Sequence, residues 1–172
     1  MRTLARWIIN ACGFGLALGG APASAQLPSA DPAPEPPAVL DVPYLPQSEL
    51  LCGGAALAMV ERWWGRRGVY AEDFAGLVRL ELRGIRTTDL ADAARTRGWE
   101  TRAFDGTPDE VRRILAGGTP VVALLRVAPD RYHYVVLLAW TERGVVFHDP
   151  ARAPSMLITE SRFLKQWRGA ER

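Results

Sequence analysis

The sequence predicts an α+β fold in which helices come first and an antiparallel sheet follows. Between residues 50 and 118, segments with helical spacing are bounded by start and stop signals. Residues 120–149 instead carry runs of Val, Leu and Tyr typical of buried strands. A turn at residues 141–144 joins two of these runs and predicts a hairpin. This order indicates helices packed against a C-terminal sheet.

The first 25 residues have the features of a secretory signal peptide. Arg2 and Arg6 precede an apolar stretch at 7–20, and residues 23–25 read Ala-Ser-Ala, an A-x-A cleavage site. The apolar stretch is shorter than the roughly 20 residues that a spanning helix needs, so cleavage is favoured over a permanent membrane anchor. We therefore expect an exported chain, periplasmic or secreted, with no stable membrane span after cleavage.

The segment at 26–41 is rich in proline and predicts an extended linker, which leaves 42–172 as one domain. Hydrophobic residues make up 48% of the chain and charged residues 23%, as in ordinary globular proteins. The formal net charge is +2, and Arg2 and Arg6 account for it. The chain after the leader is therefore neutral, which argues against a nucleic-acid binder that neutralises phosphates.

Five helices and four strands are expected in the domain. The first helix covers 50–64, with Ser48 as its cap and Gly65 at its end. Shorter helices are expected at 71–80, at 88–97 before Gly98, and at 160–167. Thr107, Pro108 and Glu110 form a capping-box signal for a further helix that ends at residues 117–118. Strands are expected at 99–104, 120–127, 132–140 and 145–149.

Cys52 is the candidate nucleophile. It lies in the first turn of the strongest predicted helix, where free N–H groups and the helix dipole favour a thiolate. Cys12 would leave with the leader, so the exported chain carries one thiol without an internal disulfide partner. Gly53 and Gly54 follow Cys52, and they either give a substrate backbone room to approach or permit tight helix packing.

His133 and Asp149 are the candidate base and its partner. His133 begins one strand of the predicted hairpin and Asp149 ends the other, so the two residues come close together. An Asp beside an imidazole sets its tautomer and stabilises its charged form. His148 is a weaker candidate because it points to the opposite face from Asp149.

Gln47 precedes the Cys52 helix by a few residues. Its side-chain amide can join the Cys52 backbone N–H in binding an oxyanion. One Cys and two His, His133 and His148, make no spaced set of metal ligands, and we expect neither a metal nor another cofactor.

Residues 42–47, Val-Pro-Tyr-Leu-Pro-Gln, and the run that starts with Cys52-Gly53-Gly54 resemble the opening of the C39 peptidase family. The His133-Tyr134 and Asp149-Pro150 segments resemble it as well. The family contains the papain-fold peptidases that remove double-glycine leaders from bacteriocins. The resemblance implies a papain-like cysteine peptidase fold, a triad of Cys52, His133 and Asp149, and an oxyanion role for Gln47.

This chain looks more like the stand-alone exported members of the family. No transporter or ATPase segment is present, and the export signal places the domain across the membrane from the transporter-fused type. The expected function is hydrolysis of a peptide or protein substrate outside the cytoplasm. Two other functions stay open: a papain-like domain that binds peptides without cleaving them, and acyl transfer to an amine by the same thiol.

Overall fold

An antiparallel sheet forms the centre of the structure, a computed structural model that describes residues 7–10, 39–168 and 170. Its strand order is β4-β1-β5-β6-β7-β8. The strands are β1 (Trp7–Asn10), β4 (Glu100–Ala103), β5 (Val121–Ala128), β6 (Arg131–Thr141), β7 (Gly144–Asp149) and β8 (Ala153–Ile158). A separate two-stranded ribbon pairs β2 (Val78–Arg79) with β3 (Gly84–Ile85).

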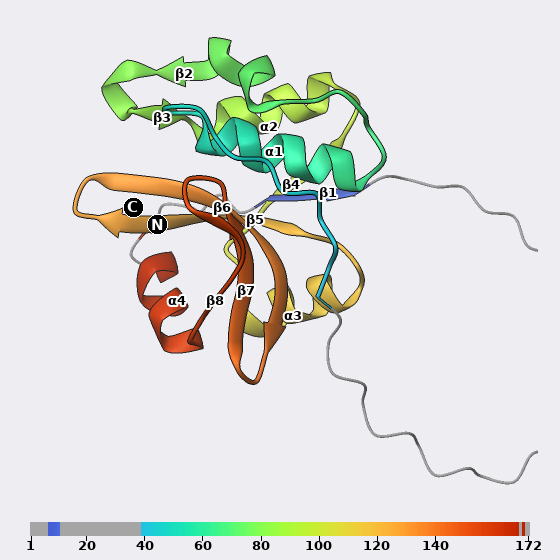
Figure 1. Ribbon diagram of the computed structural model, residues 1–172, viewed down its shortest axis with the longest axis vertical. Coiled ribbons are helices and arrows are strands. Elements are labelled where there is room, and N and C mark those ends of the chain that lie inside the picture. Colours follow the sequence, from blue (N-terminus) through green and yellow to red (C-terminus); the bar gives the residue numbers. More distant parts are fainter. Residues whose placement is uncertain (1–6, 11–38, 169, 171–172) are drawn as a thin grey trace, which may run out of the picture.

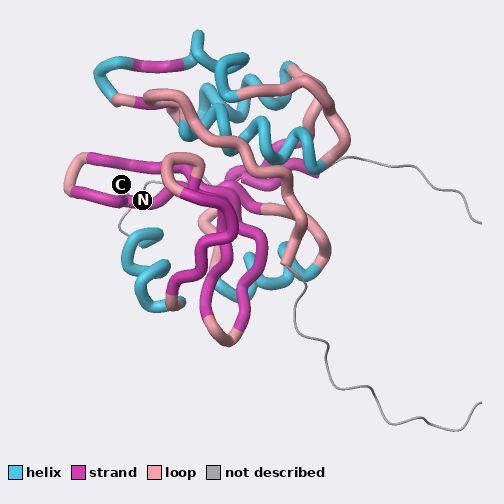
Figure 2. Tube along the Cα trace, viewed as in Figure 1, coloured by secondary structure: helices cyan, strands magenta, loops and turns pink. Residues whose placement is uncertain are grey.

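Helices cover both faces of this sheet (Figure 1). They are α1 (Cys52–Trp63), α2 (Thr87–Thr96), α3 (Pro108–Ala116) and α4 (Glu160–Arg168), with short 3₁₀ segments η1 (Ala71–Leu77) and η2 (Leu80–Leu82). Figure 2 shows the β2–β3 ribbon, α1 and α2 on one side of the sheet and α3 and α4 on the other. The α+β class expected from the sequence is confirmed.

Alternation along β6 explains why both faces are covered. Tyr134, Val136 and Leu138 pack into a core shared with α1, η1 and α2. Val135 and Leu137 point the other way, into a core shared with α3 and α4. A strand buried on both faces has no polar positions in its middle, which is why this segment reads as a continuous apolar run.

Several local predictions are confirmed, and others need correction. Gly98 has φ +89 and follows α2, and the Thr107 hydroxyl accepts a hydrogen bond from the Glu110 N–H at 3.2 Å at the start of α3. The expected helix at 71–80 is instead η1, which gives way to β2. Glu110 does not complete a capping box: its carboxylate accepts from Arg102 at 3.1 Å.

Strand β8 was not expected from the sequence. It pairs with β7 at the edge of the sheet and contains Pro154. Proline cannot donate to a strand ladder and therefore weakens the strand signal, but an edge strand tolerates it. The two-residue strands β2 and β3 are too short to leave a periodic pattern.

Most of the predicted leader and linker, including the A-x-A site at 23–25, lies outside the described residues. Within the predicted signal segment the structure describes β1, which pairs with β4 and β5. Cleavage after residue 25 would remove β1 and make β5 an edge of a β5–β8 sheet. No helix in the described ranges is long and apolar enough to cross a membrane.

Candidate active site

Cys52 is the first residue of α1, as its candidate role requires, but the helix starts differently from the prediction. The cap position is Leu51, and no side chain caps the helix, because the Ser48 hydroxyl bonds Glu72 instead. Leu50 has φ +64, an uncommon conformation for a branched residue, and the Leu51 N–H donates to the Ser48 carbonyl at 3.1 Å. This sharp turn brings Cys52 to the helix start without a competing cap on its N–H groups.

Gly53 and Gly54 serve helix packing, the second of the two interpretations considered. A Cβ on Gly53 would lie 3.1 Å from the Tyr134 ring. A Cβ on Gly54 would lie 2.7 Å from the Ala71 backbone oxygen, closer than real Cβ atoms come. The glycines therefore let α1 approach β6 and η1 closely, which holds Cys52 against the sheet.

His133 and Asp149 are in direct contact. The His133 Nε2 lies 2.7 Å from the Asp149 Oδ1. Val136 lies opposite His148 in the β6–β7 ladder. A register shift between Leu137 and Ala139 separates this pair from the hairpin turn. Asp149 is one pair further along the ladder, so its side chain reaches His133 diagonally. This resolves the register that the sequence left open.

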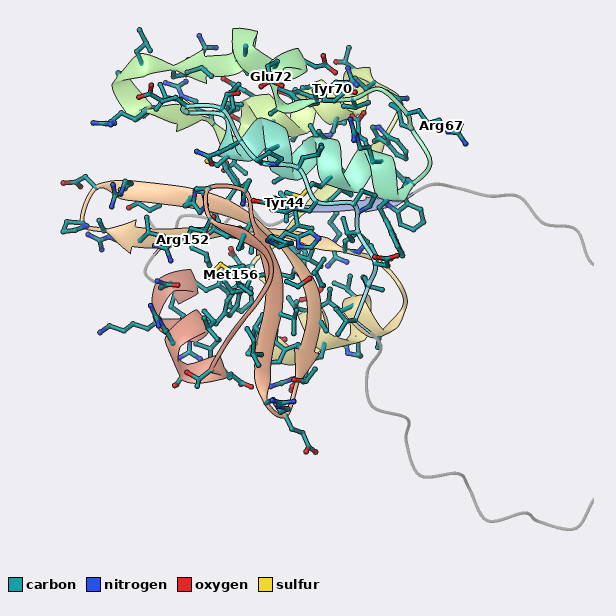
Figure 3. The ribbon with its side chains drawn as sticks, viewed as in Figure 1. Tyr44, Arg67, Tyr70, Glu72, Arg152 and Met156 are labelled. Carbon is teal, nitrogen blue, oxygen red and sulfur yellow. The ribbon has the colours of Figure 1, made fainter. Side chains whose placement is uncertain are left out.

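The Asp149 carboxylate has further partners. The Ala151 N–H donates to its Oδ1 at 2.9 Å, and the Arg152 Nε lies 3.6 Å from its Oδ2. The Tyr44 hydroxyl donates to the Asp149 backbone oxygen at 3.2 Å. Figure 3 labels Tyr44 and Arg152, which belong to the segment before α1 and to the turn after β7. Burial raises the Asp149 pKa. The hydrogen bond and charge of His133, followed by the Ala151 N–H and the Arg152 charge, outweigh burial and bring the pKa below its ordinary value.

The sequence pattern did not indicate these additional contacts. One signal for the Ala151 contact was available, since an Asp side chain often accepts from the N–H two residues later in a turn. The Tyr44 contact joins residues 105 positions apart, and no local pattern predicts it.

Gln47 lies in the same part of the molecule. Its backbone N–H donates to the Pro150 carbonyl at 2.8 Å, which ties the segment before α1 to the turn after Asp149. Its side-chain Oε1 is buried without a hydrogen-bond partner. An oxyanion role requires the other end of this side chain, the amide nitrogen, as the donor.

His148 has both ring nitrogens occupied by the backbone. Its Nε2 lies 2.8 Å from the Val42 oxygen, and its Nδ1 accepts from the Ser155 N–H at 3.0 Å. An Nδ1 that accepts carries no proton, so the ring is neutral and its Nε2–H donates. Burial lowers the His148 pKa in agreement with this. His148 acts as a structural link between strands and loops.

One hollow of about 660 Å³ borders Cys52, His133, Asp149 and Gln47. We call it the His133 hollow. Cys52 is 8% exposed and is the free cysteine of the described residues. The His133 side chain is 13% exposed and the Asp149 side chain 6%. A thiol, an imidazole and a carboxylate thus line one partly desolvated hollow, where charges interact more strongly than in water.

The electrostatics favour a charged imidazole. Burial lowers the pKa of His133, but hydrogen bonds to Asp149 and Cys52 and their charges outweigh it and raise the pKa to about 9. The Asp149 bond uses Nε2, which leaves Nδ1 as the ring nitrogen that can accept the thiol proton. The arrangement can therefore hold a thiolate–imidazolium pair oriented by a carboxylate.

We expect His133 to titrate near pH 9 and Asp149→Asn to lower this midpoint. The substitution removes the negative charge that favours the imidazolium. Since the folded pKa lies above the ordinary 6.5, the charged ring stabilises the fold below pH 6.5. That contribution is lost as the pH rises from 6.5 to about 9. An NMR titration of the ring proton measures the midpoint.

His148 is the internal reference for this titration. Its midpoint is expected below the ordinary 6.5 and unchanged by Asp149→Asn. A wild-type His133 midpoint at or below 6.5 would contradict the ion-pair arrangement.

Comparisons with known proteins identify the family and the fold. The model of the peptidase C39 family matches residues 43–170. A C39-like peptidase from Bacillus anthracis has a TM-score of 0.64 at 15% identity, over 80% of this chain and 94% of its own. A double glycine motif protease from an AMS/PCAT transporter, solved with a leader peptide, has a TM-score of 0.59 at 24% identity. The match covers 76% of this chain and 89% of that protease chain. A search of curated proteins gave no match.

Proposed function

Since the chain belongs to the peptidase C39 family, we propose that it is a cysteine peptidase that hydrolyses peptide bonds with Cys52 as its nucleophile. His133 serves as the base and acid, Asp149 orients and stabilises the imidazolium, and Gln47 contributes to the oxyanion site. The observation that carries this proposal is an imidazole that is hydrogen-bonded to a buried carboxylate and borders the same hollow as a thiol. The reaction needs no cofactor.

The steps follow from the positions of these groups. His133 takes the thiol proton, and the thiolate attacks the peptide carbonyl carbon. The oxyanion is held by the Cys52 N–H at the uncapped start of α1 and by the Gln47 amide. His133 then protonates the leaving amine, and the S–C bond of the thioester remains. Water, activated by the now neutral His133, hydrolyses the thioester and restores the thiol.

The test compares the purified 172-residue chain with its Cys52→Ala variant. Both are incubated with a peptide library under reducing conditions, and the products are identified by mass spectrometry. We expect cleavage by the wild type and none by the variant, because alanine has no group that can attack the carbonyl. The substitution removes only one sulfur atom from a buried position, so thermal unfolding should show two folded proteins.

The products also separate the other functions. Peptides that bind both proteins but are never cut would replace the proposal with a binding function. Products in which an amine replaces water on the acyl fragment would identify acyl transfer. Cleavage that persists in Cys52→Ala would reject Cys52 as the nucleophile.

We also propose that the chain is exported with its leader removed. The support is the sequence: Arg2 and Arg6, the apolar stretch and the A-x-A site. Mass analysis of the protein secreted by a bacterial host should show an N-terminus at Gln26. Protein retained in the cytoplasm with the leader intact would contradict it.

A further inference from the structure

Two adjoining hollows share Cys52, and they also share Leu82, Arg83, Asp130 and Tyr132. The His133 hollow also borders Gln47 and Asp149. A second hollow of about 540 Å³ borders Cys52 but none of those three residues. It lies between the β2–β3 ribbon and the β5–β6 hairpin, whose ends lie one above the other in Figure 1.

The chemistry assigns a direction to the substrate. The leaving amine must come within about 3 Å of His133 to receive its proton, so the amine side of the scissile bond lies in the His133 hollow. The acyl part leaves the attacked carbon in a different direction. We propose that the second hollow, here called the acyl-side hollow, binds the acyl part of the substrate and selects a large apolar side chain there. This inference rests on the proposed function.

The floor of the acyl-side hollow is apolar. Ile85 is 6% exposed and Tyr134 3%, and Leu124 is half-buried. The Tyr134 hydroxyl is already engaged, since it lies 2.6 Å from the Thr87 Oγ1 and 3.3 Å from the Ile85 oxygen. The floor therefore offers carbon surface to a ligand, and a polar side chain placed there would lose water without gaining a partner.

The rim does not compete with this selection. Glu81, Arg83, Arg86 and Asp130 border the hollow, and all four are exposed. Two are acidic and two basic, so the rim favours neither sign of charge. Exposed charges also contribute little to binding free energy in water. Discrimination is left to the apolar floor.

Glycine would use this hollow poorly. A residue without a side chain leaves the floor in contact with water, whereas leucine or phenylalanine removes apolar surface from it. At Gly84 the wall is open, with no atom within 4 Å of the point that a Cβ would occupy. We expect a preference of about 10- to 100-fold for a large apolar residue over glycine.

Peptide aldehydes test the acyl side alone, because they carry no leaving amine. The thiolate adds to the aldehyde carbon, an S–C bond forms, and the oxygen takes a proton to give a reversible hemithioacetal. Four acetyl dipeptide aldehydes are compared: Gly-Gly, Leu-Gly, Gly-Leu and Leu-Leu. The readout is protection of Cys52 from alkylation by iodoacetamide, located by peptide mass mapping because the 172-residue chain also contains Cys12. A leucine-containing aldehyde should protect at about 10- to 100-fold lower concentration than Gly-Gly.

Gly84→Phe fills the hollow from the wall and should remove most of this preference. The matched control is Gly76→Phe in η1, where the Cβ position is equally open and which does not border the hollow. The control should keep the wild-type preference. Leu124→Asn is a second variant on a different strand, which makes the floor polar. It should weaken protection by leucine aldehydes more than protection by Gly-Gly.

The outcomes separate this inference from the proposed function. Equal or better protection by Gly-Gly, together with peptide cleavage that depends on Cys52, would overturn the inference and leave the peptidase intact. A preference that survives both Gly84→Phe and Leu124→Asn would also overturn it, because the apolar residue would then bind elsewhere. If no aldehyde protects Cys52 and no peptide is cleaved, both the inference and the proposed peptidase function are rejected.

Discussion

Replacing His133 by alanine is expected to lower kcat/KM for peptide cleavage by at least about 10⁴-fold. In hydrolases that use a nucleophile and a histidine, loss of the histidine costs about as much as loss of the whole set. Here the ring is hydrogen-bonded to Asp149 and borders the same hollow as Cys52, so its removal leaves the thiol without a base and the leaving amine without an acid. The measurement is kcat/KM on a peptide that the wild type cuts.

Alkylation gives this variant a second readout. An imidazolium beside Cys52 favours the thiolate, so iodoacetamide should react more slowly with His133→Ala than with the wild type near pH 6. Cys52 is only 8% exposed in the fold. A misfolded variant would expose this thiol, so iodoacetamide would react with it faster than with the wild type in buffer without denaturant.

His148→Asn is the matched control. His148 is also buried, but it bonds the Val42 oxygen and the Ser155 N–H rather than Cys52. Its replacement should lower the free energy of unfolding and leave the kcat of the folded protein within a few-fold of wild type. A His133→Ala variant within tenfold of wild type, or an equal loss of kcat in His148→Asn, would contradict the assignment of the base.

The contrast between these two histidines shows what the sequence could predict. The hairpin turn and the alternation of strands indicated that His133 approaches Asp149 and that His148 faces away from it. The reason His148 is unavailable as a base lies outside this pattern. One partner of His148 is Val42, which lies 106 residues away in the sequence. The other is Ser155, on strand β8, which was not predicted because it contains a proline.

The start of α1 shows the same limit. Apolar and small residues followed by Gly65 predicted the helix well, because these signals are local. Its first residue depends on the unusual φ of Leu50, and Ser48 is taken by Glu72 from η1 instead of capping the helix. Local patterns therefore placed Cys52 at a helix start, whereas tertiary contacts determine which N–H groups remain free there.

The role of Glu61 was not foreseen from the sequence, although it yields the largest expected effect on stability. Its side chain in α1 is 0% exposed and accepts from the Arg97 Nε at 2.8 Å and the Arg97 Nη2 at 2.9 Å. Arg97 directly follows α2, so the pair fastens the end of that helix to α1. Arg66 adds a longer contact at 3.6 Å. The hydrogen bonds to Glu61 raise the Arg97 pKa further, so the guanidinium stays charged.

Glu61→Ala is expected to lower the free energy of unfolding by about 3–5 kcal/mol, measured by urea denaturation. The substitution leaves the half-buried Arg97 charge without its bidentate partner and opens a cavity in α1. The control is Asp92→Ala, which breaks the exposed Arg95–Asp92 pair at 2.6 Å. That change should cost less than about 1 kcal/mol, because water screens exposed ions. Equal losses in the two variants would mean that the buried pair adds nothing to the packing of α1 and α2.

The double variant Glu61→Leu with Arg97→Leu separates the pair from its parts. Replacing both ions removes the cost of desolvating them, so the double variant should recover most of the stability lost in Glu61→Ala. Its peptidase activity should then report on geometry alone, since α1 carries Cys52 at one end and Glu61 near the other. Recovered stability with reduced kcat would show that the ion pair sets the position of the helix. Recovery of both would show that apolar packing of α1 and α2 holds Cys52 in place equally well.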